Sequence, residues 1–281
     1  MNKEFAFFSS ELSSPSPHFL AIERLDSDMG TGLHEDIHTE YTDHGCRISR
    51  AVLDGTHSYH TLITGQLWLE GKEVRSRCRD ALKNIIRIYL QKAGFCLRTG
   101  KVLFCGLGNA KLAADALGPM TADRLYPGGS DPVFRFAGFT ELFVLKPGVP
   151  SQSGMSTGEH IRSLAEHLGA DLILTADATS AKTVKRLASV VQVTDRGVWA
   201  GAGSGGRSDE ISTATMPCPV ISIGVPTVIR TSLLSDGTGG KAAVTAEEFL
   251  VSRSETDLIT ECYAELVSGA LNKLFSPPLC E

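Results

Sequence analysis

The sequence predicts an α/β fold: a three-layer sandwich with a mostly parallel central sheet, plus an N-terminal β-pair and an arm. Two observations favour this fold. Short apolar runs alternate with helical patterns, which is typical of a parallel sheet covered by helices on both faces. The 281 residues are 42% hydrophobic, which is sufficient for one large core. We therefore expect a single α/β domain over residues 33–281.

The N-terminal third of the chain holds three predicted elements. Residues 1–32 are rich in serine, proline and acidic groups and lack a sustained period, which predicts an exposed arm or a removable segment. Residues 46–71 contain two β-prone runs separated by turn residues, which indicates an antiparallel pair. Apolar residues then recur at steps of three and four from Val74 to Tyr89, predicting a helix that ends near Gly94.

Four short apolar runs predict the parallel strands. They are KVLFCG at 101–106, ELFVL at 141–145, DLILTA at 171–176 and VISIGV at 220–225. Between the second and third runs, Ser156 and Glu159 form a capping box that opens a helix. A closing helix is expected over Ser254–Phe275, where apolar residues recur at helical spacing. Ligand sites of such sheets lie at the carboxyl ends of the strands.

Composition argues against several classes of function. The net charge of -5 offers no basic field for a phosphate backbone, so we expect no direct nucleic-acid partner. The sequence has no run of about 18 apolar residues and no signal-like start, so we expect a cytoplasmic protein without a membrane segment. The seven cysteines form no C-x-x-C pair. Because His57 and His60 lack a third ligand at metal spacing, we expect no metal and no cofactor.

Two aspartates follow predicted strands. Asp177 directly follows DLILTA, where an acid is either a helix cap or a site residue. Asp115 comes six residues after Asn109, and its alternative role is an N-cap or first-turn acid of the next helix. The glycines at 106 and 108 could cradle a phosphate, but Lys111 stands where a dinucleotide fingerprint needs its third glycine.

A pair of carboxylates suits peptide hydrolysis. Two acids in a poorly solvated cleft do not both ionise, so one keeps a proton. The charged acid can accept a proton from the attacking water, and the protonated acid can donate to the oxyanion or the leaving nitrogen. No Ser-His-Asp order, G-x-S-x-G elbow or H-E-x-x-H motif competes with this pair. The sequence therefore favours an aspartate-dependent endopeptidase.

Other residues are candidates for the rim of the cleft. The glycine-rich stretch 201–207 follows Asp195 and is either a mobile surface loop or a backbone that closes on an extended peptide. Pro226 ends the fourth predicted strand, where it would stop strand pairing and shape the rim.

Several motifs occur together between about Lys101 and Ile229. They are Gly106 to Asn109, Asp115 to Pro119, Pro147 to Val149, Gly154-Met155, Asp177-Ala178, Gly201 to Gly205, and Gly224 to Thr227. At these residues the sequence resembles the germination protease family, the spore endopeptidases that degrade small acid-soluble spore proteins. The resemblance implies an inactive precursor made in the forespore, self-cleavage near the N-terminus and a homotetramer. The proposed catalytic aspartates of that family match Asp115 and Asp177.

The resemblance also bears on the arm and on two places where this sequence differs from the pattern of the family. It implies that the arm is a propeptide, with the bond between Gly32 and Leu33 as a candidate processing site. A short glycine-rich piece at 236–240 stands where the family commonly has a long segment. Lys182 stands where the family tends to have arginine, and it offers a point charge in place of a planar fork. The candidate cleft residues are Gly108, Asn109, Lys182, Asp195, Gly203, Ser204 and Pro226.

Two other functions stay open. Gly-x-Gly-Asn followed by an aspartate and Gly-Pro-like text also resembles nickel-dependent maturation proteases of the hydrogenase kind. The third reading is a catalytically silent spore protein of the same fold that binds peptide or partner subunits.

Overall fold

The structure, a computed structural model, describes residues 8–9, 35–53, 56–128, 140–200, 209–234 and 249–275. Three sequence-based expectations fall elsewhere in the chain. Gly32 and Leu33 of the candidate processing site, Gly203 and Ser204 of the glycine-rich stretch, and the short piece 236–240 lie outside the described residues. These expectations stay predictions.

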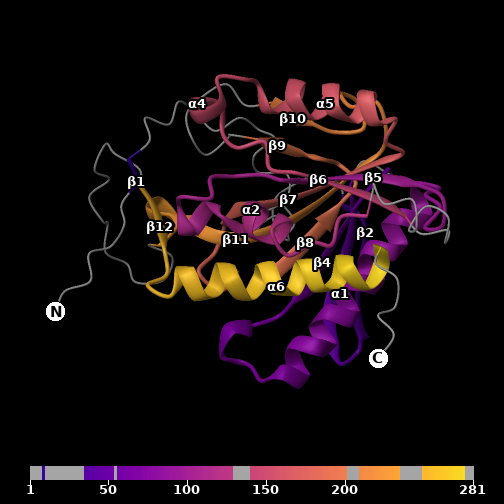
Figure 1. The fold of residues 1–281 in the computed structure, drawn as a ribbon. Helices are drawn as coiled ribbons and strands as arrows, with labels where there is room; N and C mark the ends of the chain where they lie inside the picture. Colours follow the sequence, from indigo (N-terminus) through magenta and orange to yellow (C-terminus); the bar gives the residue numbers. More distant parts are fainter. Residues whose placement is uncertain are drawn as a thin grey trace.

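A large central sheet has the strand order β2-β3-β4-β8-β11-β7-β5-β6 (Figure 1). Its parallel part consists of β11 (Val220–Arg230), β7 (Leu172–Ala181), β5 (Lys101–Gly106) and β6 (Glu141–Leu145). These four strands arise from the four apolar runs of the sequence. The α/β fold class is thereby confirmed.

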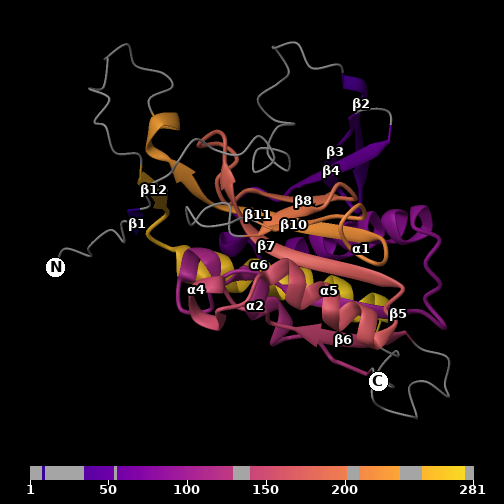
Figure 2. The same ribbon diagram turned by 90° about the horizontal axis from the view of Figure 1, so that it is seen from above.

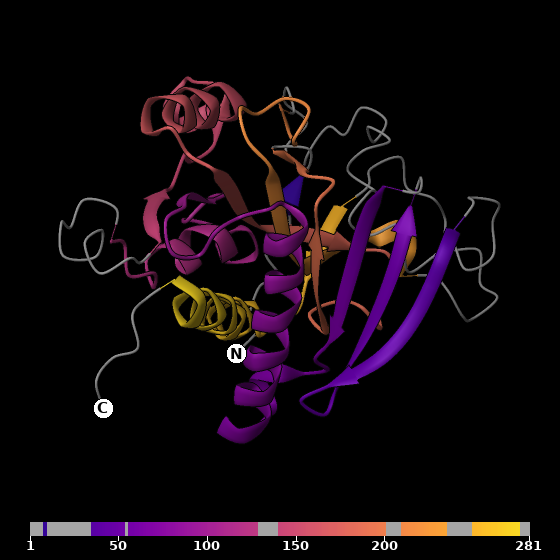
Figure 3. The ribbon, with the colours of Figure 1, turned by 90° about the vertical axis from the view of Figure 1, so that its right-hand side faces the viewer.

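The antiparallel part of the sheet is larger than the predicted pair. It consists of β2 (Glu35–Asp43), β3 (Cys46–Leu53), β4 (His57–Ile63) and β8 (Val190–Thr194). Strand β8 pairs antiparallel with both β4 and β11, so it joins this part to the parallel strands. The first three of these strands rise beside α1 in Figure 3.

Helices cover the sheet on both faces, with α5 (Thr157–Leu168) above and α6 (Thr256–Phe275) below the strands in Figure 1. Seen from above in Figure 2, α5 lies in front of α6. On one face lie α1 (Lys72–Lys92), α2 (Leu117–Ala122) and α6, which share one hydrophobic cluster. On the other face α5 and the small β9–β10 pair share a second cluster. Among the described residues, no helix is long and apolar enough to cross a membrane.

Short elements connect these layers. They are the turns η2 (Leu67–Leu69), η3 (Ala113–Asp115) and η4 (Thr231–Leu233), helix α4 (Pro150–Ser153), and strands β1 (Phe8–Ser9), β9 (Val198–Ala200), β10 (Asp209–Ile211) and β12 (Phe249–Ser252). Strand β12 pairs antiparallel with β11 and with β1.

The predicted capping box at the start of α5 is confirmed. The side-chain oxygen of Ser156 accepts a hydrogen bond from the backbone N–H of Glu159 at 3.2 Å. The Ser156 hydroxyl in turn donates to Asp209 at 2.8 Å, and the backbone N–H of Gly158 donates to the same carboxylate. An acid here also complements the positive end of the helix dipole. The helix ends at Gly169, whose left-handed φ of 61° suits glycine.

Two strands run further than the sequence suggests. We expected the third strand to end before Asp177, but β7 continues to Ala181 because β11 still pairs with it there. We also expected Pro226 to end the fourth strand, but β11 continues to Arg230. Its register against β7 shifts between Pro226 and Val228. A proline has no N–H for the ladder, and this irregularity accommodates it.

The turn between β5 and α2 packs against β7 so closely that Gly118 cannot carry a side chain. A Cβ there would lie 2.2 Å from the carbonyl oxygen of Leu107 and 2.4 Å from that of Ala176. We therefore expect Gly118→Ala to lower the free energy of unfolding by about 2–3 kcal/mol, measured from urea denaturation. Gly71→Ala is the matched control, because open space surrounds Gly71. Equal stability of both variants would contradict the close packing.

Candidate active site

The first site residue, Asp177, lies where β7 extends beyond β5. The last residue pair between these strands joins Gly106 to Ala176, so Asp177 is the next residue of β7 after that pairing ends. On the other side Asp177 is opposite Gly224 of β11. Because side chains alternate along a strand, Asp177 points to the face that α5 covers, opposite to Ala176. Four further strand residues follow Asp177, so it is no helix cap.

The second site residue, Asp115, closes the 3-10 turn η3 before α2. Its carboxylate accepts a hydrogen bond from the backbone N–H of Asn109 at 2.8 Å. The Asp115 side chain therefore bonds to the loop before η3 and not to a backbone N–H of α2. Ala116 is the N-cap of α2, so the alternative role of Asp115 as its cap is excluded. Gly108 makes this loop possible, since it has a φ of 105° and a Cβ there would lie 2.1 Å from the carbonyl oxygen of Asp115.

Three hydrogen bonds hold the turn of Asp115 in position. The backbone N–H of Leu107 donates to the carbonyl oxygen of Ala176 at 2.9 Å, directly before Asp177. The hydroxyl of Thr227 in β11 donates to the carbonyl oxygen of Ala114 at 2.6 Å. The hydroxyl of Thr260 in α6 donates to the carbonyl oxygen of Ala113 at 2.8 Å. Sequence analysis missed both threonines, because neither is near Asp115 in the chain.

The charge of Asp115 acts on the carboxyl group of Asp177. Burial raises the pKa of Asp177 well above its ordinary value, and the negative charge of Asp115 raises this pKa further. Burial also raises the pKa of Asp115 to about 6, while the N–H of Asn109 acts in the opposite direction. Burial and the charge of Asp115 thus favour the neutral form of Asp177, while the N–H of Asn109 favours the charged form of Asp115.

Neighbours of Asp177 on the extended part of β7 and β11 complete the candidate site. Thr179 lies two residues further along the same face, is 7% exposed, and its hydroxyl has no hydrogen-bond partner within the described part of the chain. Pro226 is its register partner in β11, and Lys182 directly follows β7. Sequence analysis missed Thr179, since an isolated threonine in a strand gives no functional signal.

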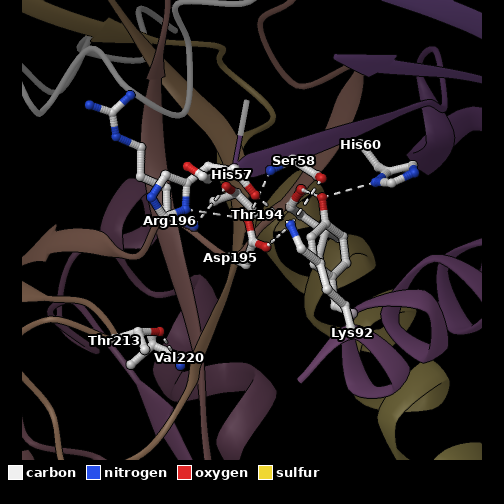
Figure 4. A network of polar contacts seen from close by, with 12 residues as sticks. His57, Ser58, His60, Lys92, Thr194, Asp195, Arg196, Thr213 and Val220 are labelled. Atoms are coloured by element: carbon white, nitrogen blue, oxygen red, sulfur yellow. Dashed lines mark hydrogen bonds and ion pairs between the residues drawn. The ribbon is translucent and has the colours of Figure 1, made fainter. Parts of the chain in front are cut away.

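The structure does not bring Asp195 to this site. Asp195 follows β8, whose last residue Thr194 is opposite Ser222, toward the amino end of β11. Its carboxylate accepts from the backbone N–H of Ser58 at 2.9 Å and pairs with Lys92 at 2.5 Å (Figure 4). It also lies 3.7 Å from Nδ1 of His57. The antiparallel direction of β8 carries Asp195 away from the carboxyl ends of the parallel strands.

Asp115 and Asp177 are the side chains of the site that could contribute ligands to a metal ion. Within the described residues, no group of three or more histidine, cysteine, aspartate or glutamate side chains could hold such an ion.

Comparison with known proteins adds independent information. The model of the germination protease family matches residues 35–239. Curated germination proteases of Geobacillus sp. (strain WCH70) and Bacillus mycoides (strain KBAB4) are 29% and 28% identical, over 71% and 78% of this chain. The chain spans 54% and 63% of their lengths. A solved NiFe hydrogenase maturation protease of Thermococcus kodakarensis KOD1 has 17% identity and a TM-score of 0.35, covering 62% of this chain and 93% of its own.

The raised pKa of Asp177 predicts a pH-dependent change in stability. Below about pH 3, under the ordinary pKa of an aspartate, both folded and unfolded chains hold this proton, whereas at higher pH the unfolded chain releases it first. The folded state therefore loses stability relative to the unfolded state as pH rises. Because asparagine cannot ionise, we expect Asp177→Asn to have the same free energy of unfolding as the original protein below about pH 3, and one higher by about 1–3 kcal/mol at neutral pH.

Urea unfolding across this pH range measures the effect, with Glu166→Gln as an exposed control. A difference between Asp177→Asn and the original protein that stays constant with pH would contradict the electrostatic account.

Proposed function

Because the chain belongs to the germination protease family, we propose that it is an endopeptidase that degrades small acid-soluble spore proteins with an aspartate pair. The observation that carries the proposal is the effect of the Asp115 charge on the pKa of buried Asp177. Two acids with separated protonation states lie at the end of the parallel strands, where sheets of this type bind ligands.

In the proposed mechanism the two aspartates have different tasks. The Asp115 carboxylate accepts a proton from the water molecule that attacks the peptide carbonyl carbon. Protonated Asp177 donates a hydrogen bond to the developing oxyanion and then a proton to the leaving nitrogen. The N–H of Asn109 orients the base by holding one of its oxygens.

The substrate is proposed to lie in extended form beside the part of β7 and β11 that continues beyond the end of β5. Thr179 offers it a hydroxyl within the face that carries Asp177. Pro226 and Lys182 flank this region, and the glycine-rich stretch with Gly203 and Ser204 is proposed to close over the peptide. Asp195 has no part in this cleft, because it is engaged with Lys92 and Ser58.

Activation by self-processing and assembly as a homotetramer in the forespore also belong to this proposal. The support is family membership together with an arm rich in serine, proline and acidic residues. We expect incubation at mildly acid pH to release the arm and to leave Leu33 as the new N-terminus. N-terminal sequencing measures this, and Asp177→Asn should block the release. Full activity with an intact Met1 would contradict self-processing.

Separate substitution of the two aspartates tests the mechanism. Asp115→Asn removes the base and Asp177→Asn removes the acid, so we expect each to lower the rate of spore-protein hydrolysis by about 100-fold or more. The rate is measured from the appearance of discrete fragments of a purified acid-soluble spore protein. Asp123→Asn is the matched control, since Asp123 is exposed directly after α2 and pairs with Lys146.

Unchanged hydrolysis by either variant would remove that residue from the mechanism.

Metal analysis distinguishes the aspartate-dependent endopeptidase from the alternative of a nickel-dependent maturation protease. Nickel bound near stoichiometry, together with loss of hydrolysis on chelation, would favour that alternative over the aspartate pair.

A further inference from the structure

A pocket lies between the antiparallel strands and α1. It has a volume of about 270 Å³ and is lined by Arg50, Val52, Thr56, Ser58, His60, Ile88, Tyr89 and Lys92. A row of register partners runs across the sheet from His60 to Ala176. In this row His60 of β4 is opposite Val193 of β8. Ile223 of β11 is opposite both Val193 and Ala176 of β7. His60 therefore shares the sheet face of Ala176, whereas Asp177 occupies the other face. The pocket is thus separate from the candidate active site.

The pocket wall follows from strand register. Arg50 of β3 is directly opposite His60 of β4, and Val52 is directly opposite Ser58. All four side chains lie on the face toward α1, because residues two apart in a strand point the same way. Helix α1 closes the opposite side with Ile88, Tyr89 and Lys92. The same strand face is apolar nearer the start of β3, where Ile48 packs in the core.

Hydrogen bonds fix the tautomer of His60. The Tyr89 hydroxyl donates its one proton to the carbonyl oxygen of Val193 at 2.9 Å. The 2.9 Å contact between Nδ1 of His60 and the Tyr89 oxygen must therefore have Nδ1–H as the donor. Burial lowers the pKa of His60 to about 4, which keeps the ring neutral at physiological pH. Its Nε2 atom is consequently an acceptor, with no partner within the described part of the chain.

The two cations of the pocket differ in their partners. The Lys92 ammonium pairs with Asp195 and donates to the carbonyl oxygen of Thr56 at 2.7 Å and to the Ser58 hydroxyl at 3.3 Å (Figure 4). Its charge and its three donors are thereby used. Arg50 has no ion-pair partner in the part of the chain that the structure describes, so its guanidinium charge is available to a ligand.

We propose that this pocket binds a small organic acid with a hydroxyl group next to its carboxylate. The carboxylate pairs with the Arg50 guanidinium, which matches it with two parallel N–H groups. The hydroxyl donates to Nε2 of His60, which needs a donor. The carbon chain packs against Val52 and Ile88. With roughly 30 Å³ for each water-sized group, the pocket holds about nine such groups, which limits the ligand to a small molecule.

Isothermal titration calorimetry of the full chain with 2-hydroxy-3-methylbutanoate tests the site. We expect saturable binding, and about 10-fold weaker binding of 3-methylbutanoate, which lacks the hydroxyl. Arg50→Gln should weaken binding of the hydroxy acid by about 10-fold or more. Arg47→Gln is the matched control, because Arg47 is on the same strand and points to the opposite face.

A spectroscopic readout keeps the test independent of any effect of substitution on folding. Nitrogen-15 resonances of the original protein should show His60 as the Nδ1–H tautomer, and the hydroxy acid should shift the Nε2 resonance. The proposal is overturned by absence of saturable binding at millimolar concentration, or by equal affinity of Arg50→Gln and Arg47→Gln. Inorganic phosphate that binds as tightly as the hydroxy acid would also overturn it, because the site would then recognise charge alone.

Discussion

The close backbone contact between the β5–α2 turn and β7 determines where both candidate catalytic groups lie. Gly106 and Gly118 allow it, because a Cβ at either position would overlap backbone atoms of the turn or of β7. The contact carries Asp115 to the extended part of β7 that bears Asp177. Thr227 and Thr260 then hold the turn from two other elements. The site thus depends on three separate segments packing together, and its geometry is lost if any of them moves.

That arrangement has an electrostatic consequence. Two acids in one poorly solvated region cannot both be charged at low cost, so their protonation states separate. The N–H of Asn109 favours the charged form at Asp115. The N–H of Ala178 acts in the same direction at Asp177, but burial and the charge of Asp115 outweigh it. The features that destabilise an ionised Asp177 are those that suit it to donate a proton. Stability and the proposed activity therefore oppose one another at this residue.

The central sheet gives the protein two chemically different regions. Its parallel strands place Asp177 on the face of α5, and the turn η3 that follows β5 carries Asp115. Its antiparallel strands form a separate pocket on the face of α1, with a neutral histidine and an available arginine. Strand β8 joins the two regions and directs Asp195 to the second one. A residue expected at the cleft thus supports a different part of the molecule.

The sequence by itself determined the four parallel strands, the helices at 72–92, 157–168 and 256–275, and the capping box at Ser156. Each of these depends on local periodicity or on residues a few positions apart, so the information lies within one segment. The tertiary structure alone decided how far β7 and β11 extend, since that depends on which strand lies beside each end. The tertiary structure alone also decided the surroundings of Asp115, because hydrogen bonds from distant segments hold its turn. It decided the partners of Asp195 as well, because the antiparallel direction of β8 follows from packing.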